Sequence, residues 1–136
     1  MPNYEVGEIE GIGATYAAKL KEADIDRTEG LLEACCTPGG RKAISGKTGI
    51  TEKLLLKWAN MADLMRISGV GKQYAELLEN AGVDTVKELK TRNTENLAAK
   101  MKEVNEVKKL AKSSPAVSLV EGWIAQAGSL PPKITH

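Results

Sequence analysis

Two short glycine phrases carry the clearest chemistry in this sequence: GVGK at residues 69–72 and GIG at residues 11–13, each followed by apolar residues at helical spacing. A glycine in a reversal takes a positive φ without a Cβ clash. The first amides of the helix that follows have no intrahelical partner, and they lie at the positive end of its dipole. Both phrases therefore predict an anion site, with phosphate as the expected anion.

The residues beside each phrase separate the two. Glu8 and Glu10 precede the first phrase, and their carboxylates would repel phosphate, so Gly11, Ile12, Gly13 and the later Ala17 are predicted to be structural. Basic and amide side chains flank the second phrase. We therefore predict that phosphate is bound by Arg66, Gly69, Val70, Gly71, Lys72 and Gln73, with Ala75 letting the two flanking helices pack closely.

The segment SGKTG at residues 45–49 imitates a nucleotide-binding loop. A Walker loop needs a glycine at position 41, which is Arg41, and an apolar strand before it, which is missing. No nucleotide is therefore expected. Two interpretations remain open: an auxiliary phosphate contact through Arg41, Lys42, Lys47 and Thr48, or a solvated basic turn.

The sequence offers few candidates for catalytic residues. The single histidine is His136 and the two cysteines, Cys35 and Cys36, are neighbours, so there is no candidate for a catalytic triad, a zinc site or an unstrained disulfide. We expect a protein that is not an enzyme and has no cofactor. Free thiols and an acidic N-terminal stretch without a signal-peptide core predict a cytoplasmic protein, and no apolar run predicts a membrane span.

The elements around the phrases form an internal duplication. A shift of 58 residues places residues 9–26 on residues 67–84, and a shift of 65 places Trp58 on Trp123. The sequence thus predicts two units, residues 1–65 and 66–136, each ending in a helix that carries a tryptophan. Such small units bury little apolar surface alone, so we expect them to pack as one body.

Every segment with periodicity is helical, so the predicted fold is all-α. Asp26, Asp84 and Asn93 are predicted N-caps. Ser114-Pro115 is predicted to begin the helix of Trp123, and GKTG to separate a helix at 38–45 from the next one. Trp58 and Trp123 are expected to pack in the core. Tyr16 and Tyr74 take equivalent places on the helices that follow the two phrases, where they either pack against a neighbouring helix or stack on sugars or bases.

The pattern IxGVGxxxAxxL at residues 67–78, like IxGIGxxxAxxL at residues 9–20, resembles the helix-hairpin-helix motif of DNA-repair and recombination proteins. The whole chain is similar to an uncharacterised bacterial family with paired hairpins, apart from Cys35-Cys36, where a small alanine-like residue is expected. The resemblance implies two SAM-like pseudo-repeats in one compact body. It also implies hairpin amides that hold a DNA phosphate, and in some hairpins carbonyls that hold a monovalent cation.

Two functions from different classes follow. One is non-catalytic, non-sequence-specific DNA binding through residues 66–73, favoured by seven basic and two acidic residues between 41 and 72. The other is a protein-interaction or scaffold module whose hairpins are only structural, favoured by a net charge of +1 and by eight acidic against three basic residues in 1–40.

Overall fold

The computed structural model describes residues 3–136, so residues 1 and 2, with which the predicted first unit begins, lie outside it. The described residues form a short 3-10 helix and eight α-helices, which confirms the all-α prediction, and their only β-structure is an isolated antiparallel bridge between Glu5 and Arg27. In chain order the helices are η1 (Val6–Glu8), α1 (Ala14–Glu22), α2 (Thr28–Cys35), α3 (Pro38–Thr48), α4 (Glu52–Leu64), α5 (Lys72–Asn80), α6 (Val86–Leu89), α7 (Thr94–Lys108) and α8 (Val117–Ser129).

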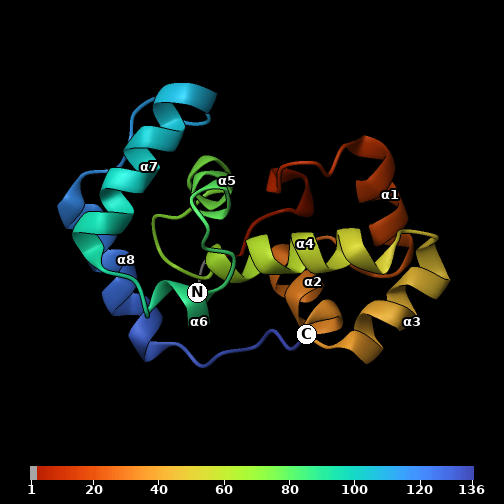
Figure 1. Ribbon diagram of the computed structural model, residues 1–136. Coiled ribbons are helices and arrows are strands. Elements are labelled where there is room, and N and C mark those ends of the chain that lie inside the picture. The colour runs from red at the N-terminus through yellow and green to blue at the C-terminus, as the bar shows by residue number, and fades with distance from the viewer. Residues whose placement is uncertain (1–2) are drawn as a thin grey trace.

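Helix α4 lies across the middle of the molecule (Figure 1). It packs against α2 and α3 and, at its other end, against α5. Helices α7 and α8 pair with one another, and α5 and α6 each pack against one of them. None of the helices described between residues 3 and 136 combines the length and the apolar character that a membrane crossing requires.

The core is one continuous cluster of buried side chains drawn from all these helices. Its two largest members are Trp58 of α4 and Trp123 of α8, both 1% exposed, as predicted. Each indole meets a tyrosine from the helix behind a glycine phrase. The ring centroids of Tyr16 and Trp58, and those of Tyr74 and Trp123, are 5.1 Å apart in both pairs.

Several predicted helix ends are wrong. Helix α3 continues through Gly46 to Thr48 and stops at Gly49, whose φ of 76° gives the left-handed cap that favours glycine. The Thr48 hydroxyl donates to the Ile44 carbonyl (2.8 Å) and accepts from the Ile50 amide (3.2 Å), so it finishes the helix. GKTG is therefore the last turn of α3 rather than a break.

The predicted caps are partly confirmed. The Asn93 side chain caps α7, as expected, but Asp84 does not cap α6, because the Thr85 hydroxyl accepts from the Glu88 amide instead. Asp26 is likewise not a cap. Its carbonyl accepts from the Val6 amide (3.0 Å), and the Glu29 amide at the start of α2 donates to Asn3, far away in sequence.

The start of α8 also differs from the prediction. This helix begins at Val117 with Ala116 as its N-cap, and no side chain bonds to that cap. Pro115 lies buried in the loop before it rather than in the first turn. Burial of the Pro115 ring and of Val120 fixes the entry of the helix, so packing overrides the Ser-Pro signal.

Candidate nucleic-acid interface

The two glycine phrases fold into corners with the same backbone geometry. We call residues 9–13 the first corner and residues 67–71 the second corner. Gly11 has a φ of 94° and Gly69 a φ of 93°. In each corner the fourth residue donates its amide to the first residue's carbonyl, Ile12 to Ile9 and Val70 to Ile67, both at 3.1 Å. The positive φ that the sequence required of these two glycines is therefore present.

Each corner ends at the beginning of a helix that no side chain caps. Gly13 is the N-cap of α1 and Gly71 the N-cap of α5, both with extended backbone. A Cβ built on either glycine would meet nothing within 4 Å. Because a glycine cannot cap with a side chain, the opening amides of both helices are left for water or for an external acceptor.

The residue between the glycines points inward at both corners. The Val70 side chain is fully buried and the Ile12 side chain nearly so. Ala75, one turn into α5, is also buried. Val70 can therefore offer only its backbone to a ligand, while Gly69, Lys72 and Gln73 are exposed.

A tryptophan lies directly beneath each corner. A Cβ at Gly11 would sit 3.4 Å from the Trp58 Nε1, and one at Gly69 the same distance from the Trp123 Nε1. The Trp123 Nε1 is buried and has no acceptor. The second corner is further held by Gln126 of α8, whose side chain accepts from the Ser68 amide (3.0 Å) and donates to the Ser68 carbonyl (3.4 Å). The Ser68 amide is thus unavailable to a ligand.

The two corners are neighbours in space. The Lys72 Nζ, just after the second corner, lies 3.5 Å from the Glu10 carboxylate within the first corner, and both side chains are about half exposed. The cation that we expected to be free for phosphate is therefore paired with a carboxylate. Sequence reasoning noted both residues but carried no signal that they meet, because their contact depends on how the two halves pack.

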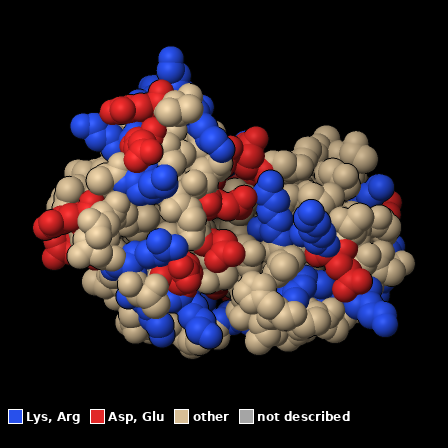
Figure 2. Space-filling model, in the orientation of Figure 1, with Lys and Arg blue, Asp and Glu red and all other residues tan. Residues whose placement is uncertain are grey.

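Further carboxylates lie along α5. Burial raises the pKa of Glu76, and the carboxylates of Glu10 and Glu79 raise it further, against the opposing effect of Lys72 and Lys57. Lys57 of α4 also approaches Glu79 to 4.0 Å. Figure 2 shows basic and acidic side chains side by side over the middle of this face. The candidate interface is therefore a mixed-charge surface, not a basic one.

Arg66 does not belong to this surface, and its predicted phosphate contact is wrong for this structure. Its guanidinium is buried and its Nη1 donates to the Asp63 carboxylate at 2.8 Å. The other Asp63 oxygen accepts from the Val86 amide at the start of α6 (2.8 Å). Arg66 thus ties the end of α4 to α6 instead of facing solvent.

The auxiliary set is also dispersed. Arg41 is buried, with its guanidinium bonded to the carbonyls of Cys35 (3.0 Å) and Thr135 (2.8 Å), so it does not offer the exposed auxiliary contact to DNA that was predicted. The Thr48 hydroxyl is used in the hydrogen bonds that end α3. Of the auxiliary set, only Lys42 and Lys47 are exposed. Figure 1 shows α3 beside α2 and the beginning of α4, away from α5. The structure does not bring the auxiliary set to the second corner.

The cysteines offer no alternative site. Burial raises the pKa of Cys35 to about 11, outweighing the opposite effect of Arg41, so this thiol stays protonated at neutral pH. Both cysteines are free, and Cys36 is half-buried. Within residues 3–136 no group of three or more His, Cys, Asp or Glu side chains is arranged to hold a metal ion.

Comparison with known proteins identifies a family. A family model described as Domain of unknown function (DUF4332) matches residues 10–130, a range that includes the second corner, all of the first corner except Ile9, and both tryptophans. No solved structure matches the chain.

Proposed function

The chain belongs to the DUF4332 family of domains of unknown function, and we propose that it binds the DNA backbone without sequence specificity and without catalysis. In this proposal the two corners are helix-hairpin-helix elements of two related halves. The opening amides of α5 hold a phosphate oxygen, and Lys72 neutralises its charge.

One observation carries the proposal: two uncapped helix starts with the same backbone geometry lie side by side at the surface. A glycine N-cap leaves free an opening amide to which a serine or aspartate side chain at that position would bond. An uncapped helix start is useful if an external acceptor bonds to the free amides in place of a capping side chain. The acceptorless Trp123 Nε1 beneath the second corner adds a further donor dipole there.

The Lys72–Glu10 pair does not prevent this role. An ion pair between half-exposed side chains contributes about 0.2–1 kcal/mol, and it weakens with salt. A phosphate that receives charge-assisted hydrogen bonds from Lys72 and from α5 amides together competes well against a single carboxylate. Glu10 then lowers the affinity for phosphate, because its carboxylate stays close to the bound anion.

A titration tests the proposal. We expect the anisotropy of a short labelled duplex to rise with wild-type protein at low salt and the affinity to fall as salt increases, with a log–log slope of about −0.9 for each phosphate that is neutralised. Lys72→Glu should abolish binding because it places a second carboxylate at the anion site. Glu10→Gln should strengthen binding because it removes one.

The matched control is Lys102→Glu, the same charge change at an exposed position on α7, which should weaken binding little. Equal losses in the two lysine variants would contradict a site at the second corner.

The mixed charge around α5 favours a second candidate, a protein-interaction module whose corners only build the fold. The same titration separates the two. Absence of DNA binding by wild-type protein and Glu10→Gln at low salt would assign the exposed corner face to a protein partner.

A further inference from the structure

The last residues of the chain return to the first half of the molecule. Residues 130–136, which we call the strap, leave α8 and run without helix along one edge of the molecule until they reach α2 (Figure 1). At its end the Thr135 amide and hydroxyl both donate to the Cys36 carbonyl, at 2.8 and 3.3 Å. The strap thus joins the turn between α2 and α3.

The strap covers Arg41. Arg41 as a whole is only 4% exposed, and its Nη2 donates to the Thr135 carbonyl. Its Nη1 donates to the Cys35 carbonyl. None of the ion pairs formed within residues 3–136 includes Arg41.

Arg66 gives the comparison. It is buried to a similar degree but has the Asp63 carboxylate at 2.8 Å. A buried full charge is compensated well by an opposite charge and only partly by carbonyl dipoles. Arg41 is therefore a buried cation with two carbonyl partners and, among residues 3–136, no carboxylate within ion-pair distance.

We propose that Arg41 is an oxyanion-binding site, with a phosphate group as its ligand, that the strap occupies with its own Thr135 carbonyl. A guanidinium presents two parallel N–H donors, which fit two phosphate oxygens better than two separate carbonyls. Phosphate binding through both of these donors then requires the strap to leave Nη2 and requires Nη1 to release the Cys35 carbonyl, so the strap lowers the affinity of the site. This inference is independent of the DNA-binding proposal, because neither Lys72 nor the corners take part in it.

Much of the strap is exposed and makes few hydrogen bonds. Pro131 and Pro132 have no amide hydrogen, and residues 131, 132, 135 and 136 are exposed. Leu130, Lys133 and Ile134 are half-buried, and Leu130 and Ile134 pack against the core. The hydrogen bonds at Thr135 add to this packing, and losing them shifts the closed–open equilibrium by about tenfold.

Two full-length variants test the proposal with inorganic phosphate as the probe and chloride at equal ionic strength as the reference. Thr135→Pro removes the amide and hydroxyl donors and frees the strap, whereas Thr135→Val keeps the amide and the carbonyl. We expect Thr135→Pro to reach half of its phosphate-induced rise in Tm at about tenfold less phosphate than wild type. Thr135→Val should behave nearly like wild type.

Amide exchange in the wild-type protein provides the second measurement, which does not depend on any variant folding. Phosphate should speed exchange of the Thr135 amide, because that amide loses its bond to Cys36. Unchanged exchange in phosphate, or the same phosphate response in Thr135→Pro and wild type, would overturn the proposal.

Discussion

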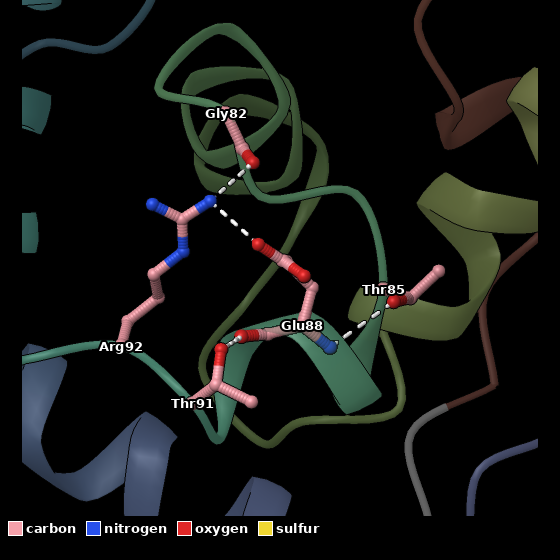
Figure 3. A network of polar contacts seen from close by, with 5 residues as sticks. All are labelled: Gly82, Thr85, Glu88, Thr91 and Arg92. Carbon is pink, nitrogen blue, oxygen red and sulfur yellow. Dashed lines mark hydrogen bonds and ion pairs between the residues drawn. The ribbon is translucent and has the colours of Figure 1, made fainter.

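Asp63 and Arg66 form a buried pair that holds the end of α4, the second corner and the start of α6 together. A different kind of pair, Arg92 with Glu88 at 2.6 Å, lies nearer the surface and also bonds to the Gly82 carbonyl (Figure 3). The two pairs have similar distances but differ in exposure. Burial, not distance, decides how much each carboxylate contributes to stability.

Asp63→Asn should therefore be severe. It leaves the Arg66 guanidinium buried beside a neutral amide, and we expect a loss of about 3–5 kcal/mol in the free energy of unfolding, measured by urea denaturation. Glu88→Gln is the control, with an expected loss of at most about 1 kcal/mol. Similar losses in the two variants would show that the buried charge is not the determining factor.

The two glycines of the second corner have opposite requirements. Gly69→Ser should destabilise the protein by about 1–3 kcal/mol, because the φ of 93° strains any other residue. Gly71→Ser should stabilise it by roughly a few tenths of a kcal/mol, because the backbone there suits an N-cap and the serine hydroxyl bonds to an open amide. Thermal unfolding of the two variants checks both signs. A stabilised Gly69→Ser would refute the strain argument.

At the scale of elements, α5 is the helix whose charges respond most to pH. The raised pKa of Glu76 means that folding penalises its charged form. The free energy of unfolding should therefore fall as pH rises from the ordinary pKa of 4.5 to the raised folded pKa, and the penalty stays in place above that window.

Glu76→Gln removes this penalty. We expect the variant to be more stable than wild type at neutral pH, and the ionisation part of that gain to disappear below pH 4.5. Urea denaturation at a series of pH values measures the difference. A gain that stays constant across the series would trace to packing instead of charge.

Local signals predicted the helices well and some of their ends poorly. The apolar spacing and the two glycine phrases sufficed for α1, α4 and α5, because these features act within one turn of the chain. Asp26 failed as a cap because residues 3–6 pair with that segment. Ser114-Pro115 failed because burial sets where α8 begins. In both places a contact from elsewhere in the fold outweighed the local preference.

At the scale of the whole molecule, the same limit applies to the candidate site. The geometry of both corners could be predicted, because glycine spacing and φ are properties of a few consecutive residues. Which charged side chains would be buried, and which would be paired, could not be predicted. Nothing in the sequence distinguishes Arg66 and Arg41 from exposed basic residues. Only the packing of α6 and of the strap shows that both are buried. The Lys72–Glu10 contact likewise depends on the two halves meeting.

The placement of the tryptophans gives the molecule its own optical probes. Each corner has one indole beneath its glycine and one tyrosine beside that indole, and the chain contains no other tryptophan. Tryptophan emission therefore comes from two known positions, one beneath each corner. Replacing Trp58 by phenylalanine leaves an unlabelled protein whose tryptophan fluorescence comes from beneath the second corner alone.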